Sequence, residues 1–226
     1  MNRLISWLCN IFIAPIIKFL LVRRIKGWEN IPKTNFILAS NHESHLDWII
    51  DGTICVPKSF RFVGQTDQYS GLTKVLLYIM YFLAGVIHIN RKKKESKKRM
   101  FEQAIESLKA GDCLIIYPEG TRTRTGQIGR GKRGIARIFL ETGKPILPVA
   151  IKGTFEILPP RSKIRIDKIK RTVEINIGKP LYFKEEYEKA KSVDKNSEEY
   201  GLLLSKITGK MMNEIISLRS ELDSKI

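Results

Sequence analysis

Short apolar runs alternate with longer stretches of helical periodicity after Pro32. Apolar runs of this length are typical of strands buried on both faces of a sheet. The stretches between them place apolar residues three or four positions apart, as the buried face of a helix does. Strands are predicted at 35–40, 59–64, 85–89, 113–117 and 146–151, and helices at 46–56, 73–83 and 94–109. Together they predict an α/β fold with a central, largely parallel sheet flanked by helices.

The C-terminal part of the chain has a different pattern. Residues 163–169 and 172–178 alternate apolar and polar positions, which predicts two half-buried antiparallel strands. A final helix is predicted from an apolar stripe that we expect to pack on the sheet. The stripe consists of Leu203, Ile207, Met211, Ile215, Leu218 and Leu222.

The N-terminus carries an almost wholly apolar stretch at residues 4–22, long enough for a membrane-spanning helix. Asn10, Pro15 and Lys18 interrupt it; a proline kinks a helix, and a lysine is expensive at membrane depth. We therefore predict a broken helical pair that dips into one leaflet, with a single span as the alternative. Residues 1–27 are expected to anchor an α/β domain of residues 28–226. The flanking positive charge predicts that this domain lies on the cytoplasmic face of the cytoplasmic membrane.

The charge of the chain indicates a polyanionic partner. Lys and Arg total 40 against 23 Asp and Glu, a formal net charge of +17. Anionic lipid, a phosphorylated substrate or nucleic acid would each complement this charge. The three cysteines are far apart and form no CxxC pair, which argues against a zinc ribbon and a disulfide framework.

The segment from Asn41 to Asp47, NHESHLD, lies at a predicted strand-to-helix turn. Open α/β sheets place their sites at such turns. His42 and Asp47 can meet if His42 stays in the turn and Asp47 begins the helix. A carboxylate on one imidazole nitrogen would then leave the other free to take a proton from a hydroxyl. Spacing alone equally allows a capping box from Ser44 to Asp47, and the spacing from His42 to His45 is one residue short of a helical zinc pair, so no metal site is predicted.

A second segment, Tyr117 to Arg122, follows another predicted strand and should reach the same edge of the sheet. Residues 120–140 contain several glycines, arginines and lysines and no acid. Arginine grips phosphate oxygens with a forked pair of donors. A solvated basic loop is the alternative. Residues 126–133 nearly match a nucleotide P-loop, but Arg133 stands where Ser or Thr should hold Mg²⁺, so that interpretation is rejected.

Four short motifs in order give the chain a resemblance to the glycerolipid acyltransferases. Residues 41–47 resemble the first motif of that family and 118–122 the third, while 85–91 and 147–151 resemble the second and fourth. The chain has Tyr117 where the family commonly has Phe. The resemblance implies that His42 is the general base and that Asp47 orients it. It also implies a substrate phosphate site, made by Arg91, Glu119, Gly120, Thr121 and Arg122, in which Glu119 organises the pocket.

The resemblance implies acyl transfer from acyl-ACP or acyl-CoA to the sn-2 hydroxyl of lysophosphatidic acid, giving phosphatidic acid. The expected partners are that acceptor, the carrier thioester and an anionic membrane surface; neither nucleic acid nor a cofactor or metal is expected. One rival hypothesis changes the acceptor to glycerol-3-phosphate, another lysophospholipid or a lyso-ornithine lipid. Outside acyl transfer, the rival hypotheses are a hydrolase and a non-enzymatic basic protein that binds membrane or nucleic acid.

Overall fold

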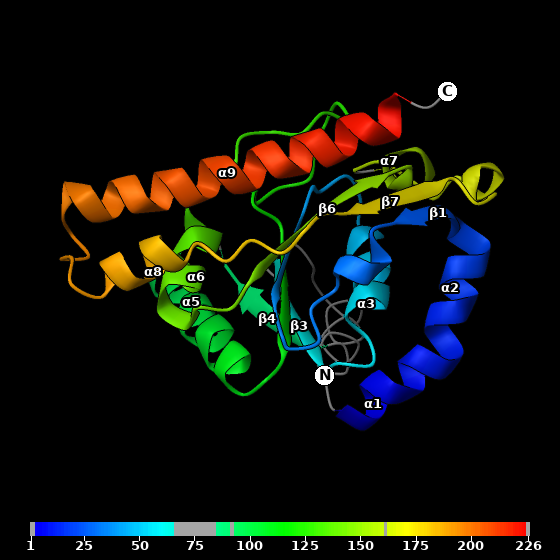
Figure 1. The fold of residues 1–226 in the computed structure, drawn as a ribbon. Coiled ribbons are helices and arrows are strands. Elements are labelled where there is room, and N and C mark those ends of the chain that lie inside the picture. The colour runs from blue at the N-terminus through cyan, green and yellow to red at the C-terminus, as the bar shows by residue number, and fades with distance from the viewer. Residues whose placement is uncertain (1–2, 66–84, 91–92, 161, 225–226) are drawn as a thin grey trace.

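The computed structural model describes residues 3–65, 85–90, 93–160 and 162–224, whose strands form one seven-stranded sheet (Figure 1). The strand order is β1-β7-β6-β2-β5-β3-β4, and every neighbouring pair is parallel except β6 with β7. The predicted, largely parallel sheet is therefore confirmed. The strands are β1 (Val22–Lys26), β2 (Ile37–Ser40), β3 (Phe60–Gln65), β4 (Val86–Ile89), β5 (Cys113–Ile116), β6 (Ile146–Lys152) and β7 (Val173–Ile177).

Helices cover both faces of the sheet. Successive residues of β2 point to opposite faces, so Ile37 and Ala39 join one core cluster while Leu38 joins the other. Helices α5, α6, α8 and α9 pack on the first cluster, and α2 and α3 pack on the second. The α-helices are α1 (Arg3–Leu8), α2 (Ala14–Leu21), α3 (Asp47–Cys55), α5 (Lys94–Lys109), α6 (Gly134–Thr142), α7 (Thr154–Ile157), α8 (Lys184–Ala190) and α9 (Glu198–Asp223).

Most elements predicted from hydrophobic periodicity are present within a residue or two of their predicted bounds. The six apolar residues of the predicted final helix are buried in α9. Helices α6 and α8 were not predicted. The sequence of α6 was taken as part of the Gly-rich loop. The helix predicted at 73–83 lies outside the described residues.

The prediction of a strand at 163–169 is wrong. This stretch contains only a short 3₁₀ turn, η3 (Ile166–Lys168), and its residues 163–168 are exposed. The free side of β7 that a further strand would need is taken by β1, which pairs with β7 in parallel. We predicted β1 as the basic flank of the apolar helix, but its Arg23 and Arg24 form ion pairs with Glu174 on β7.

The N-terminal apolar segment is helical from Arg3 to Leu21, with a mean hydropathy of 2.0 in its most apolar window, of which only 11% is buried. By length and composition it could cross a membrane. Its middle turn, η1 (Cys9–Ile13), is π-helical, and Pro15 is the second residue of α2, which follows it. The Ala14 N–H bonds to the Cys9 carbonyl five residues back, and the helix bends there (Figure 1). The helix therefore bends where a break was predicted but stays continuous from Arg3 to Leu21, while dipping and spanning both stay predictions.

Candidate functional site

The two predicted site segments meet at one edge of the sheet. Their strands β2 and β5 are parallel neighbours, with Ala39 opposite Ile116, so the residues that follow both strands lie side by side. The His42 N–H donates to Glu119 Oε1 at 2.9 Å. The Thr123 N–H donates to the His42 carbonyl at 2.8 Å. The two segments are thus joined by hydrogen bonds in both directions.

His42 and Asp47 form the predicted pair. His42 Nδ1 lies 2.7 Å from Asp47 Oδ2, with His42 in the turn and Asp47 as the first residue of α3. The Asp47 side chain is fully buried, and the His42 side chain is 17% exposed. The second carboxylate oxygen, Asp47 Oδ1, accepts a hydrogen bond of 2.6 Å from the hydroxyl of Thr154, at the start of α7. The carboxylate is therefore fixed from two sides, and it contacts the imidazole at Nδ1, the nitrogen opposite Nε2.

Asp47 also serves the start of its own helix. Its Oδ2 accepts hydrogen bonds from the backbone N–H of Glu43 at 2.7 Å and of Ser44 at 2.8 Å. This is the reciprocal half of a capping box. In the other half, the Ser44 hydroxyl accepts the N–H of Leu46 at 3.1 Å in place of that of Asp47, and it donates to the Leu158 carbonyl at 2.9 Å. Capping and orientation of His42 are therefore combined in one carboxylate.

Tyr117 packs against one face of the His42 ring. The two rings stack with centroids 3.9 Å apart and an angle of 9° between their planes. The Tyr117 hydroxyl donates to Asp51 Oδ2 at 3.0 Å. Burial, reinforced by the charge of Asp47, raises the pKa of Asp51 well above its usual range. A phenylalanine at position 117 could not make this link to α3.

Glu119 anchors the glycine- and arginine-rich loop to the turn that holds His42. It is 5% exposed, and its Oε2 accepts a hydrogen bond of 2.8 Å from the Gly129 N–H. The Lys132 N–H donates to the Pro118 carbonyl at 2.8 Å. Both ends of the loop are thus fastened beside the strand end, which differs from the solvated-loop alternative.

Three of the predicted phosphate-site residues directly follow Glu119, whose side chain contacts the His42 N–H. Gly120 has a φ of 66°, and a Cβ there would lie 2.8 Å from Lys132 Nζ, so this position favours glycine. Thr121 is exposed and Arg122 is half-buried. Arg122 lies near His45: partial desolvation, followed by the positive charges of Arg122 and His42, lowers the pKa of His45 to about 4. Arg91 lies outside the described residues.

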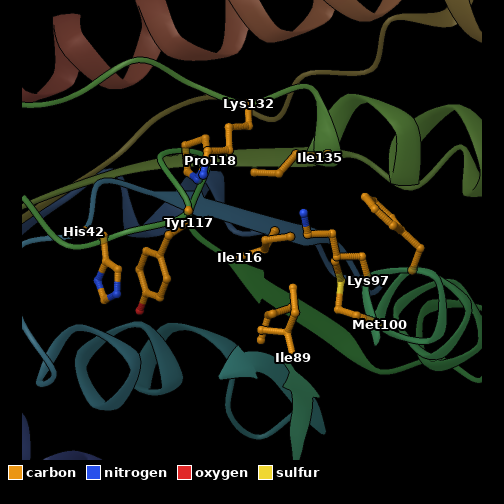
Figure 2. Close-up of a pocket in the computed structure, with 13 residues that line it drawn as sticks. His42, Ile89, Lys97, Met100, Ile116, Tyr117, Pro118, Lys132 and Ile135 are labelled. Atoms are coloured by element: carbon orange, nitrogen blue, oxygen red, sulfur yellow. The ribbon is translucent and has the colours of Figure 1, made fainter. Parts of the chain in front are cut away.

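A cavity of about 340 Å³ opens beside the His42 ring (Figure 2). His42 and Tyr117 lie at one end of it, and apolar side chains from β3, β4, β5, α5 and α6 form most of its wall. Two lysines also reach it. The lining residues are His42, Val63, Ile89, Lys97, Met100, Phe101, Ile116, Tyr117, Pro118, Gly120, Lys132, Gly134 and Ile135.

Sequence reasoning missed the side chains that hold the His42 turn from outside. The Asn41 amide bonds to both the N–H and the carbonyl of Ile151 on β6, at 2.8 and 2.9 Å. Glu43 is 2% exposed and pairs with Arg219 of α9 at 3.4 Å. Asn41 begins the first motif and could have been found there. Arg219 and Thr154 lie in segments whose sequence gives no local signal.

Comparison with known proteins is consistent with this geometry. The chloroplastic 1-acyl-sn-glycerol-3-phosphate acyltransferase BAT2 of Brassica napus is 31% identical over 160 residues, 70% of this chain and 44% of that protein. The 1-acyl-sn-glycerol-3-phosphate acyltransferase of Pseudomonas aeruginosa is 33% identical over 133 residues, 56% of this chain and 48% of that protein. The chain thus spans about half the length of the curated relatives it matches.

The fold has a counterpart among solved structures. The crystal structure of the 1-acyl-sn-glycerophosphate acyltransferase PlsC from Thermotoga maritima has a TM-score of 0.65 at 24% identity, over 96% of this chain and 82% of that one. The model of the Acyltransferase family matches residues 22–152, more than half of the chain. That match includes both segments of the site, and the chain therefore belongs to the acyltransferase family.

Proposed function

We propose that this protein transfers an acyl chain from an acyl thioester to the sn-2 hydroxyl of 1-acyl-sn-glycerol-3-phosphate, which yields phosphatidic acid for phospholipid synthesis. The observation that carries the proposal is the 2.7 Å contact between His42 Nδ1 and Asp47 Oδ2 on a ring that lines an apolar cavity. The names of the relatives support the choice of acceptor.

In this scheme Asp47 keeps the proton of His42 on Nδ1, so Nε2 is the basic nitrogen. As the acceptor O–H gives its proton to Nε2, the oxygen bonds to the thioester carbonyl carbon. The tetrahedral intermediate then collapses with cleavage of the C–S bond, and the leaving sulfur takes the proton back from Nε2. General acid–base catalysis of this kind contributes roughly 10² to 10⁴ in rate. The scheme uses neither a covalent acyl-enzyme nor a metal or cofactor.

The acceptor phosphate is assigned to the turn formed by Gly120, Thr121 and Arg122, with Arg91 as a further cation. The left-handed backbone at Gly120 and the half-buried position of Arg122 support this assignment. A phosphate bound at this turn would hold the sn-2 hydroxyl within reach of His42, and such positioning can supply a large part of the rate gain. Glu119 would act on this site only indirectly, because each of its carboxylate oxygens accepts a backbone N–H.

The apolar cavity is assigned to the acyl chain of the donor. Its isoleucine, valine, methionine and phenylalanine walls suit a hydrocarbon chain, and its opening beside His42 would put the thioester carbonyl next to the base. The donor is acyl-ACP or acyl-CoA. The apolar segment from Arg3 to Leu21 would keep the protein at the cytoplasmic face of the membrane, where the lipid acceptor and product reside.

The test is acyl transfer by the purified full-length protein with labelled acyl-ACP and acyl-CoA. His42→Ala should abolish transfer to 1-acyl-sn-glycerol-3-phosphate and leave the thermal unfolding curve unchanged. Asn196→Ala is the control, because Asn196 is exposed in the connection between α8 and α9. A folded His42→Ala protein with full activity would contradict the proposal.

The acceptor assignment needs a separate comparison. Arg122→Ala should raise the KM for 1-acyl-sn-glycerol-3-phosphate and leave the KM for the thioester unchanged. Acceptors without a terminal phosphate should be poor substrates of the unmodified enzyme. An unchanged acceptor KM would remove Arg122 from the phosphate site, and equal use of a lyso-ornithine lipid would reassign the acceptor.

A further inference from the structure

The connection between α7 and β7 forms a basic segment on the surface, defined here as residues 162–172. It carries several cations and one acid, and two isoleucines stand among them with large exposed fractions: 48% for Ile164 and 75% for Ile166. Single exposed apolar residues are common on proteins. Two exposed isoleucines within three residues, each flanked by charged side chains, are a concentrated feature of this surface. The cations are Lys163, Arg165, Lys168, Lys170 and Arg171, and the acid is Asp167.

The basic segment is fastened to the C-terminal end of the apolar helix. The Arg171 N–H donates to the Leu20 carbonyl at 3.2 Å, and its Nε donates to the Val22 carbonyl at 3.1 Å. Arg23, the second residue of β1, lines one hollow together with Lys170 and Arg171. In Figure 1 the segment lies beside the end of α2 from which β1 continues.

The neighbouring helix supplies an apolar surface that the segment extends. Nine large apolar side chains between Arg3 and Leu21 are between 41% and 72% exposed. They are Leu4, Trp7, Leu8, Ile11, Phe12, Ile13, Ile16, Phe19 and Leu20. Apolar side chains next to a cluster of cations match the boundary of an anionic bilayer, where acyl chains meet phosphate groups.

We propose that the basic segment is a second membrane contact, in which its cations bind the phosphate groups of anionic phospholipids and Ile164 and Ile166 enter the interfacial region. An acidic protein could pair with the same cations. It would not explain why exposed isoleucines stand between those cations, nor why the segment adjoins the apolar helix. The lipid surface accounts for all three features.

The experiment measures binding of the full-length protein to phosphatidylcholine vesicles with and without phosphatidylglycerol. The triple variant Lys163→Ser, Arg165→Ser, Lys170→Ser should bind the anionic vesicles about 100-fold more weakly, since each cation near such a surface adds about fivefold to partitioning. Its binding to neutral vesicles should be unchanged. Added salt should reduce the difference between variant and unmodified protein, because the attraction is screened within a Debye length.

The matched control removes three exposed cations from α8 and the residue that follows it, on the side of the molecule away from α2 (Figure 1). Lys184→Ser, Lys189→Ser, Lys191→Ser changes the net charge equally and should bind both kinds of vesicle like the unmodified protein. Ile164→Ser with Ile166→Ser should weaken binding to both kinds of vesicle roughly tenfold. The corresponding control on α9 is Leu202→Ser with Ile216→Ser, which replaces residues of 64% and 46% exposure.

Equal anionic-vesicle binding by the two triple variants would overturn the proposal. So would unchanged vesicle binding accompanied by weaker binding of acyl carrier protein, which would assign the segment to a protein partner. Thermal unfolding of each variant shows that it is folded. Because the readout is binding and not acyl transfer, it is independent of the proposed reaction.

Discussion

Glu43, next to His42, should make the stability of the protein depend on pH. Its carboxyl is 2% exposed, and its hydrogen bonds to Asn41 and Arg219 are long, at 3.3 and 3.4 Å. Burial raises its pKa from 4.5 to about 8; the charge of Arg219 opposes this shift and that of Asp47 adds to it. The informative change is Glu43→Gln, which keeps the shape and an acceptor oxygen for Asn41 and Arg219 but cannot ionise.

The sign follows from the direction of the shift. The folded-state pKa lies above the unfolded value, so the protonated carboxyl favours the folded protein. That stability is fully present below pH 4.5 and is lost as the pH rises toward 8. With 1.36 kcal/mol for each pKa unit, the loss between pH 5 and pH 8 is about 3 kcal/mol. Glutamine does not titrate, so the Glu43→Gln variant does not undergo this loss. Its free energy of unfolding should therefore exceed that of the unmodified protein by about that amount at pH 8.

The assay is unfolding by urea in detergent at several pH values from 5 to 8. The two proteins should differ by no more than about 1 kcal/mol at pH 5 and diverge steadily above it. In thermal scans near pH 8 the variant should unfold about 6 to 12 °C higher, at 2 to 4 °C for each kcal/mol in a chain of this size. Other titrating groups contribute equally to both proteins and cancel in the difference.

Glu102→Gln is the control, because Glu102 is an exposed glutamate in the middle of α5. The unfolding free energy of Glu102→Gln should follow that of the unmodified protein, with a constant difference, at every pH. Parallel curves for Glu43→Gln as well would refute the argument, since they would mean that Glu43 titrates alike in the folded and unfolded chain.

Substitutions at four further positions have expected outcomes. Asp47→Asn should lower kcat by roughly 10³ to 10⁴ with little change in KM, because an amide does not hold the Nδ1 proton of His42, and steady-state kinetics will check this. Tyr117→Phe should lower the unfolding free energy by about 1 kcal/mol through loss of its hydrogen bond and keep kcat within a few-fold, whereas Tyr117→Ala, without the stacked ring, should lower kcat about tenfold. Gly27→Ala should destabilise the protein by at least about 2 kcal/mol, because its φ is 72° and its Cβ would lie 1.9 Å from a carbonyl oxygen of β7. Gly209→Ala, at a helix position where a Cβ meets nothing within 4 Å, should instead stabilise it by about 0.5 to 1 kcal/mol in the same denaturation series.

The interior strands could be predicted because burial on both faces leaves a continuous apolar run. β2 and β5 are buried at every position. The edge strand β1 could not be predicted in this way. Its sequence VRRIK is exposed at Arg23 and directly follows a long apolar helix, so it reads as the basic end of that helix. What makes it a strand is its pairing with β7, about 150 residues away.

The alternation at 163–169 misled the prediction for a related reason. A period of two indicates that one side of an extended chain is apolar, but it does not indicate what that side contacts. In β7 the apolar side faces the core, and in the basic segment Ile164 and Ile166 face outward. The same pattern thus describes a half-buried strand and, in the proposed membrane contact, a surface for lipid.

Within the site, the sequence could indicate the participants but not what holds them. His42, Asp47 and Glu119 stand in two short motifs at strand ends, and parallel pairing brings those ends together. Thr154 and Arg219 approach the same turn from 107 and 176 residues away, where hydrogen-bond geometry alone identifies them. Their contribution depends on the packing of α7 and α9, which no local pattern specifies.

From the sequence, Asp47 could be explained either as part of a helix cap or as the partner of His42. In the structure Asp47 Oδ2 accepts two backbone N–H groups of the turn and faces His42 Nδ1, while Oδ1 is held by Thr154. The backbone donors remove the rotational freedom that an aspartate at a helix start would otherwise have. A carboxylate fixed in this way presents one lone pair to Nδ1 in a single direction, and that direction sets where Nε2 points. The start of α3 and the orientation of His42 therefore depend on the same hydrogen bonds, so a change that frays the first turn of this helix should also misplace the proposed base.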